Sequence, residues 1–361
     1  MVAGGAPALK NKLGIRPICC GAKSLQTAHC SQVGWRRQGL AEWGGKKRAI
    51  VVAMFSYRHA FHAGNHADVL KHLVLTATLD YLRQKDTALA LIDTHAGCGL
   101  YRLDGDFAQT SGESQHGIRS LLAEAGTAQA QGPSALAHYL ELVRQLNDGQ
   151  ADGAARKLLY PGSPAIMQAL MRAQDHLHAF ELQPADMRAL QGNLAQGPHA
   201  GRVKVWHEDG WAGSLRLLPP PSRRALALCD PSYEMKTDYA QAQRWLAEAL
   251  RKFATGTYIV WFPIIPRPEA HELPRKLKAI ARQAGKPSLM ASLSIKSGSQ
   301  SGVKVPGQKP KRTGMVASGV LVVNPPYTLH EQLQQALPLL VKSLGQDHMA
   351  AYKLEAPAGQ G

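Results

Sequence analysis

Short apolar runs that end in an acid or a polar turn recur along the chain and are typical of buried strands in a parallel sheet. The runs that predict strands are 88–92, 178–182, 203–207, 225–229 and 257–263. Segments with apolar residues at helical spacing separate several of them, so strands and helices alternate. The alternation predicts an α/β fold with a doubly wound, Rossmann-like sheet, which binds ligands at the carboxyl ends of its strands.

The helical pattern adds a small insertion to this plan. The first predicted helix follows Asn65, whose side chain suits an N-cap, and its apolar spacing continues to about residue 84. Residues 101–158 then interrupt the alternation with two helical stretches, 120–125 and 135–146, joined by Gly- and Gln-rich linkers. We interpret 101–158 as a helical insertion within the sheet fold.

The second half of the chain continues the pattern. Ser163 and Pro164 predict a helix start, with Ser163 as N-cap and Pro164 at the first helical position. The further predicted elements are helices at 239–253, 275–284 (strongly basic) and 331–344, and a closing hairpin of 289–295 with 314–324. We expect the tail after the last helix to be frayed.

Composition points to a polyanionic partner. The 361 residues hold 42 Lys and Arg against 26 Asp and Glu, which gives a formal charge of +16 and a pI near 9.7. Nucleic acid is the commonest partner of such proteins, although a basic enzyme without one remains an alternative. No run of about 18 apolar residues predicts a membrane span. The scattered cysteines do not suggest a disulfide framework, so we expect the reducing cytoplasm.

Half of the excess charge lies in residues 1–53, where Glu42 is the single acid. This segment has no helical or strand period. We therefore expect residues 1–53 to be a disordered extension and residues 54–355 to form the folded domain.

A nucleoside-binding cleft is predicted at three strand ends. The first strand runs through Asp93 into a turn with Gly97 and Gly99, which lets the backbone approach a ligand closely. The missing third glycine counts against a dinucleotide. Glu181 is placed to accept hydrogen bonds from ribose hydroxyls, and Asp209, before Gly210, could accept one from an adenine amino group.

The sequence Asp230-Pro231-Ser232-Tyr233 follows the most apolar of the predicted strands. An acid and a carbonyl there can hold a planar amine, so we predict methyl transfer to an adenine amino group in nucleic acid. Asp230 and the Pro231 carbonyl would accept the two N–H groups, and Tyr233 would stack on the flipped base. Core packing of Tyr233 at the strand end is the alternative.

Two other patterns were weighed and set aside. Asn324-Pro-Pro-Tyr327 matches the amino-methyltransferase signature better, but the last strand of such a sheet runs antiparallel, so we interpret it as a structural turn. His62 and His66, four residues apart, have the spacing of metal ligands on a helix. With no Cys or HExxH motif beside them, we expect no metal site.

With these motifs in place, the chain from Met54 resembles the bacterial 23S ribosomal RNA adenine-N6 methyltransferases of the RlmJ type. The matching segments are SYRHAFHAGNHADVLKH, IDTHAGCGLY, YPGSP, the DGW turn and DPSYEMKTDY. The resemblance implies a Rossmann-like class I methyltransferase domain with a helical insertion, and S-adenosyl-L-methionine as cofactor. By matching position it implies cofactor binding by His72, His95, Ser163, Glu181, Asp209 and Gly210. It further implies that Asp230 is the catalytic acceptor and that Tyr57 contacts the RNA.

The chain departs from the family pattern in three places. Ser232 stands where the family has a second proline, the basic loop 296–312 is longer, and residues 1–53 have no counterpart. The resemblance implies a cytoplasmic monomer that acts on 23S rRNA, protein-free or in an early precursor. A DNA adenine-N6 methyltransferase and a non-catalytic RNA-binding protein of the same fold remain alternatives.

Overall fold

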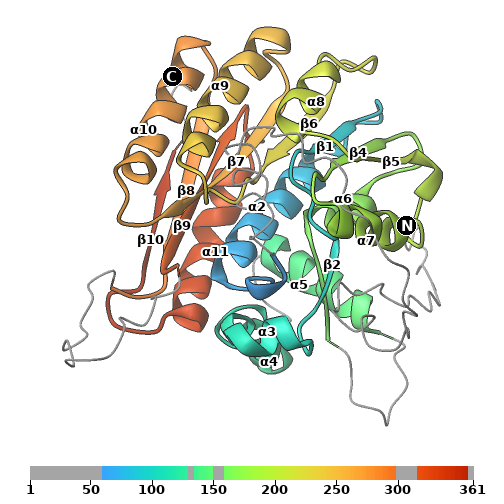
Figure 1. Cartoon of the computed structure of the whole chain (residues 1–361). Coiled ribbons are helices and arrows are strands. Elements are labelled where there is room, and N and C mark those ends of the chain that lie inside the picture. The colour runs from blue at the N-terminus through green and yellow to red at the C-terminus, as the bar shows by residue number, and fades with distance from the viewer. Residues whose placement is uncertain (1–58, 129–133, 149–157, 298–314, 357–361) are drawn as a thin grey trace, which may run out of the picture.

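An eight-stranded mixed sheet with the order β10-β8-β9-β7-β6-β1-β4-β5 forms the centre of the molecule (Figure 1). The computed structural model describes residues 59–128, 134–148, 158–297 and 315–356. The predicted extension 1–53 and most of the basic loop 296–312 lie outside the described residues. None of the described helices is long and apolar enough to cross a membrane.

The parallel half of the sheet confirms the Rossmann-like prediction. Its strands are β1 (Ala90–Asp93), β4 (His176–Phe180), β5 (Val203–Trp206), β6 (Ala225–Cys229) and β7 (Thr257–Ile264). All five residues of β6 are buried, because helices cover both faces of the sheet at this central strand. Asp93 at the end of β1 is in register with Leu228 of β6 and Ala179 of β4, so the carboxyl ends of these strands lie together.

The remaining strands are antiparallel and correct one prediction. β9 (Ala317–Val323) pairs antiparallel with both β7 and β8 (Ser288–Ser294). The pairing with β8 confirms the predicted closing hairpin, and the pairing with β7 confirms that the strand before Asn324 runs antiparallel. The expected frayed tail was wrong, because residues after the last helix form β10 (Ala351–Glu355) on the edge of β8. The edge of β8 offered unpaired backbone groups, and the tail satisfies them.

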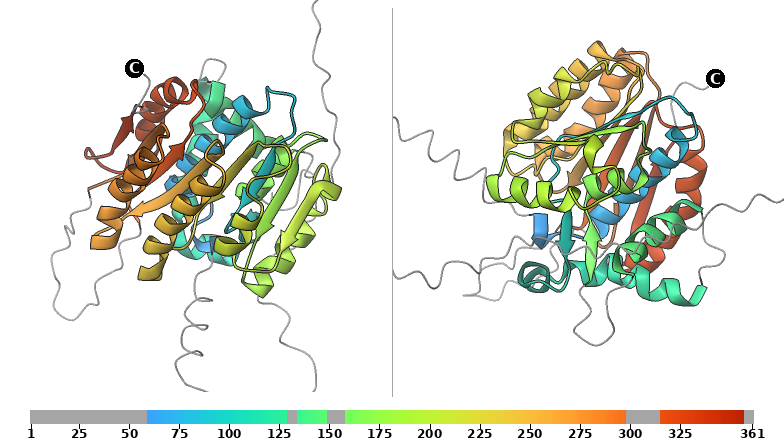
Figure 2. Two further views of the ribbon diagram at one scale, coloured as in Figure 1. Left: turned by 90° about the horizontal axis from the view of Figure 1, so that it is seen from above. Right: turned by 90° about the vertical axis from the view of Figure 1, so that its right-hand side faces the viewer.

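Helices pack on both faces of the sheet (Figure 2). On one face lie α2 (His66–Leu82), α6 (Ser163–Leu170), α7 (Pro184–Leu194) and α11 (Leu329–Leu344). On the other lie α8 (Gly210–Arg216), α9 (Lys236–Lys252) and α10 (Pro268–Gln283). α10 starts seven residues earlier than the basic stretch predicted, because Pro268 opens it and Pro274 is accommodated inside.

Two helix starts were predicted, and one needs correction. Asn65 caps α2 as expected, since its side chain accepts from the backbone N–H groups of Ala67 and Asp68. The N-cap of α6 is Gly162 rather than Ser163, which is already helical, and Pro164 follows within the first turn. The one-residue shift leaves the Ser163 hydroxyl free of the capping role.

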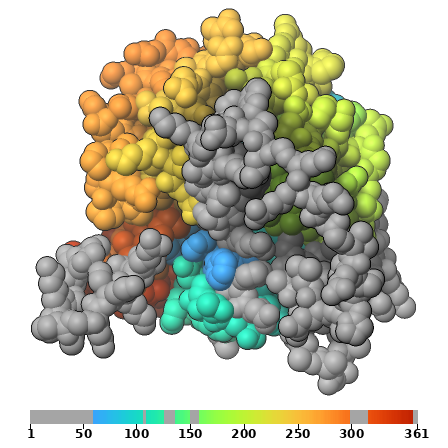
Figure 3. Space-filling model, in the orientation of Figure 1, coloured from blue at the N-terminus to red at the C-terminus, as the bar shows by residue number. Residues whose placement is uncertain are grey.

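The insertion contains more than the two predicted helices. Those two are confirmed as α4 (Ile118–Ala128) and α5 (Ser134–Asn147). Within the insertion the structure adds α3 (Asp106–Ser111) and the short helix η2 (Glu113–His116), and a ribbon of β2 (Leu100–Arg102) with β3 (Leu159–Pro161) stands where the insertion begins and ends. Two further short helices, η1 (His59–Phe61) and η4 (Ala200–Arg202), lie outside it. In Figure 3 the start of the described chain (blue) reaches the surface directly above the insertion (cyan).

An arginine joins α2 to β6 at the end of the sheet away from Asp230. The Arg224 guanidinium, just before β6, donates to the carbonyl oxygens of Leu82 at 2.5 Å, Lys85 at 3.2 Å and Thr87 at 2.5 Å. These carbonyls belong to the last turn of α2 and the loop after it, whose acceptors the helix itself cannot satisfy. The amino end of β6 is thereby fixed to the carboxyl end of α2.

Candidate active site

A cavity of about 560 Å³ lies at the carboxyl ends of β1, β4, β5 and β6. Most of the site residues expected from the sequence line it: His72, His95, Ser163, Glu181, Asp209, Gly210, Asp230 and Pro231. Residues from segments far apart in the chain are therefore brought together as predicted. Tyr57 lies outside the described residues, and Tyr233 is placed elsewhere. Across the described ranges, no group of three His, Cys, Asp or Glu side chains is arranged to hold a metal ion.

Glycine is required where the backbone borders the cavity. Gly97 has a φ of 59°, in the left-handed region, and its N–H donates to Glu181 Oε2 at 2.9 Å. A Cβ on Gly210 would lie 1.8 Å from the carbonyl oxygen of Thr94, so only glycine lets α8 start against the end of β1. These two contacts join the ends of β1, β4 and β5 into one wall.

The Glu181 carboxylate is held in place and partly neutralised. Besides Gly97, the N–H of Gln183 donates to its Oε1 at 2.7 Å. Burial raises the pKa of Glu181 to about 7, although these backbone donors oppose the rise. Asp209 caps α8 by accepting from the Trp211 N–H at 3.0 Å. Both acids present oxygens to the cavity, which suits a ligand with several hydroxyl or amino groups.

Two histidines of the cavity wall are kept neutral by burial. His72 is fully buried, and burial holds its pKa well below the usual value. Its Nδ1 lies 2.7 Å from the hydroxyl of Tyr160, and its Nε2 has no hydrogen-bond partner within the described part of the chain. Burial lowers the pKa of His95 to about 3, and its Nδ1 lies 2.7 Å from Thr94 Oγ1. An unpaired buried ring nitrogen at the cavity wall is suited to a polar ligand atom.

Asp230 is bound by a buried lysine that the sequence reading did not single out. Lys71 Nζ lies 2.5 Å from Asp230 Oδ2 and 2.8 Å from Asp68 Oδ1. Burial alone would lower the pKa of Lys71, but the charges of Asp230 and Asp68 outweigh it and raise the pKa. Lys71 therefore stays an ammonium ion between two carboxylates.

The charged chain continues behind Lys71. Asp68 Oδ2 accepts from the backbone N–H of Gly64 at 2.9 Å and lies 3.0 Å from His59 Nε2. Burial would raise the pKa of Asp68, but His59 and Lys71 hold it well below its usual value. The spacing of Asp68 and Lys71, three residues apart in a predicted helix, was a sequence signal for an ion pair. In the structure the first fourteen residues of this helix are all buried, so the pair is buried as well.

Tyr233 does not occupy the position expected for base stacking. Its side chain is 2% exposed, its hydroxyl donates to the carbonyl oxygen of Trp261 at 2.8 Å, and its ring packs against Tyr239 at 4.8 Å between centroids. The ring is part of the core and does not line the cavity, which agrees with the alternative of core packing. The buried hydroxyl finds its partner on β7, and this draws the ring inward.

The second signature-like segment is a structural turn, as predicted. Asn324 follows the antiparallel β9 and donates from Nδ2 to the carbonyl oxygens of Ala254 at 3.0 Å and Gly256 at 2.7 Å. These bonds tie the end of β9 to the loop before β7. Tyr327 is 71% exposed and meets the ring of Tyr81 edge-on. None of these residues lines the cavity.

Comparison with known proteins gives consistent matches over most of the chain. A family model described as "Ribosomal RNA large subunit methyltransferase D, RlmJ" matches residues 86–355. The chain is 38% identical over 291 residues to the "Ribosomal RNA large subunit methyltransferase J" of Escherichia coli (strain K12), covering 81% of the chain and 94% of the relative. The protein of the same name from Haemophilus influenzae is 35% identical over 302 residues, covering 84% of the chain and 98% of the relative.

The fold has a solved counterpart. A crystal structure of a protein from Legionella pneumophila str. Philadelphia 1 is 30% identical to the chain, with a TM-score of 0.69. The match covers 82% of this chain and 99% of that one.

Proposed function

Because the chain belongs to the RlmJ family of large-subunit ribosomal RNA methyltransferases, we propose that it methylates the N6 amino group of an adenine in 23S rRNA. The family, the class I methyltransferase fold, the rRNA methyltransferase activity and the use of S-adenosyl-L-methionine are as the motifs predicted. Family membership favours neither a DNA methyltransferase nor a non-catalytic RNA-binding protein. The N6 position rests on one observation: Asp230 presents a carboxylate oxygen at the cofactor cavity.

The cavity fits the cofactor. S-adenosyl-L-methionine supplies an electrophilic methyl group on a sulfonium. A cavity of about 560 Å³ is within the usual range for such ligands. We assign the ribose hydroxyls to Glu181 and the adenine amino group to Asp209. His72, with its unpaired Nε2, His95 and Ser163 would meet the remaining polar atoms.

Asp230 and Pro231 are proposed to orient the target amine. The lone pair of an exocyclic adenine amine is delocalised into the ring, so the site has to turn it towards the methyl group. Asp230 Oδ2 is bound to Lys71, whereas Oδ1 has no hydrogen bond to any described residue. Oδ1 and the Pro231 carbonyl would accept the two N–H groups. S-adenosyl-L-methionine, when bound, would supply the methyl group, and Asp230 or water would take the proton that the amine gives up.

The proposal extends to the setting of the reaction. We propose that the enzyme acts as a cytoplasmic monomer on protein-free or early precursor RNA. Light scattering of the enzyme with and without RNA tests this point, and activity that requires a dimer would contradict it.

One assay tests the activity and its target. Labelled S-adenosyl-L-methionine is incubated with unmodified, protein-free 23S rRNA or with duplex DNA, and the modified nucleoside is identified by mass spectrometry. We expect N6-methyladenosine in the RNA only. Asp230→Ala should abolish transfer and leave cofactor affinity, measured by calorimetry, within a few fold. Methylation of another base, or an active Asp230→Ala enzyme, would refute the assignment.

A further inference from the structure

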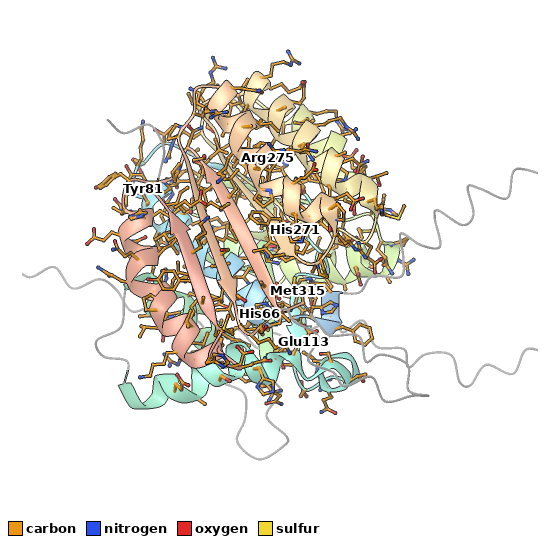
Figure 4. The ribbon with its side chains drawn as sticks, turned by 90° about the vertical axis from the view of Figure 1, so that its left-hand side faces the viewer. His66, Tyr81, Glu113, His271, Arg275 and Met315 are labelled. Atoms are coloured by element: carbon orange, nitrogen blue, oxygen red, sulfur yellow. The ribbon has the colours of Figure 1, made fainter. Side chains whose placement is uncertain are left out.

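Helix α10 carries basic side chains along one flank. His271, Arg275, Lys278 and Arg282 follow the spacing i, i+4, i+7 and i+11, so they share a face, and Lys286 continues it after the helix. The side chains that α10 buries against the sheet are different ones: Ala270, Leu273, Leu277 and Ala281. Figure 4 views the molecule from this side and labels His271 and Arg275. These basic side chains therefore form a surface feature of α10.

Few acids neutralise this surface. Arg275, Arg282 and Lys286 form no ion pair with a carboxylate of the described ranges. Lys278 shares Glu355 of β10 with Lys353, with Nζ–oxygen distances of 2.7 and 2.8 Å. We call Arg275, Lys278, Arg282, Lys286 and Lys353 the α10 stripe. Its five cations form ion pairs with one carboxylate, Glu355, and the nearby Glu272, whose charge Arg275 also feels, is already paired with Lys276, so the net charge of the stripe is positive.

The start of α10 is attached to the catalytic loop. Arg267, the N-cap of α10, donates from its guanidinium to the carbonyl oxygen of Tyr233 at 3.3 Å. Two residues later, Glu269 pairs with Lys236 at 3.0 Å, where α9 leaves the Asp230 loop. The stripe therefore leads away from a helix end that borders the active site. Arg275 and Arg282 are two turns apart, or about 10 Å along the axis.

We propose that the α10 stripe binds the phosphate backbone of the RNA substrate outside the target nucleotide. This inference rests on the proposed function, because it assigns a second contact surface to the same substrate. Exposed guanidinium groups without carboxylate partners suit bidentate contacts to phosphate oxygens. The linear spacing of the cations suits successive phosphates of one strand. The cavity orients the target base, and the stripe fixes the RNA that flanks it.

Salt dependence of binding gives a direct test. Arg275→Ala, Arg282→Ala and Lys286→Ala are combined in one variant. The matched control combines Arg244→Ala, Lys252→Ala and Lys342→Ala, which removes the same charge from exposed side chains of α9 and α11, also without ion pairs in the described ranges. Affinity for full-length 23S rRNA is measured over a range of salt concentrations. Each lost phosphate contact should lower the slope of log affinity against log salt by about one.

For the stripe variant we expect the slope of log affinity against log salt to become shallower by up to about three. The variant should bind the full-length RNA more weakly, and its rate at saturating RNA should be unchanged. The control variant should match the wild type. A short RNA that carries only the target adenine and its neighbours should bind both variants and the wild type equally. Equal slopes for the stripe and control variants would overturn the inference. Intact RNA binding without methyl transfer by the wild type would instead contradict the proposed function.

Discussion

Lys71 and Asp230, 159 positions apart in the chain, meet with 2.5 Å between Nζ and Oδ2. The contact joins α2 to the loop after β6 that carries Asp230. It fixes the direction of one Asp230 oxygen and leaves the other for the substrate. The same ammonium ion also neutralises Asp68, so its removal affects both folding and chemistry.

The Lys71→Met variant tests this relationship. It leaves the buried Asp68 with only His59 and the Gly64 N–H as partners among the described residues, so we expect a loss of about 3–5 kcal/mol in the free energy of unfolding. Methyl transfer should fall by about two orders of magnitude, because Asp230 loses its orientation. The double variant Lys71→Met/Asp230→Asn should be less destabilised than the sum of the single variants. If the losses in unfolding free energy, measured with denaturant, were strictly additive, Lys71 and Asp230 would not be energetically coupled.

Cofactor binding should weaken in mild acid. In the free protein the pKa of Glu181 is raised to about 7, so the carboxyl becomes protonated as the pH falls below that value. Ribose hydroxyls that donate to Glu181 favour the ionised form, and binding must then release a proton. Affinity for S-adenosyl-L-methionine should therefore be constant above about pH 7 and fall by up to about tenfold per pH unit below it. Calorimetry measures this, and Glu181→Gln should bind more weakly with the step near pH 7 removed.

Gly210→Ala should disturb both stability and cofactor binding. The new Cβ would meet the Thr94 carbonyl oxygen, which belongs to backbone and cannot swing aside. We expect a loss of about 1–3 kcal/mol in stability, with weaker cofactor binding. Gly201→Ala is the control, because a Cβ there has nothing within 4 Å. If the midpoint of thermal unfolding shifted equally in both variants, the close approach of α8 to β1 would have no effect on stability.

Ser232→Pro should not reduce turnover. Ser232 is exposed at the cavity mouth, and among the described residues its side chain has one hydrogen bond, a long one of 3.5 Å from the Glu234 N–H to its hydroxyl. Restricting the unfolded chain should stabilise the protein by up to about 1 kcal/mol. Steady-state kinetics and thermal unfolding check the two effects. A marked drop in the rate would mean that the loop needs the freedom that serine gives.

The pattern of apolar and polar residues along the chain predicted the sheet and most of the residues that line the cavity, because an apolar run followed by polar residues marks the end of a strand. It failed where a side chain's direction depends on distant partners. Tyr233 is three residues from Asp230 in sequence, yet its hydroxyl donates to the carbonyl oxygen of Trp261 in β7, which holds the ring in the core. In the sequence, Lys71 does not differ from an ordinary helix residue, because its contact with Asp230 depends on how α2 lies against β6. β10 was missed because an edge strand is stabilised by its neighbour, β8, rather than by its own apolar residues.

Arg224 gives the Lys71–Asp230 contact a second support. α2 and β6 touch at one end through that contact and are held at the other by the carbonyl bonds of Arg224. With both ends fixed, the helix cannot slide along the strand, and the reacting carboxylate keeps its alignment without further contacts in the cavity. We therefore expect the alignment of the Asp230 carboxylate to depend partly on an arginine at the opposite end of β6, which does not line the cavity.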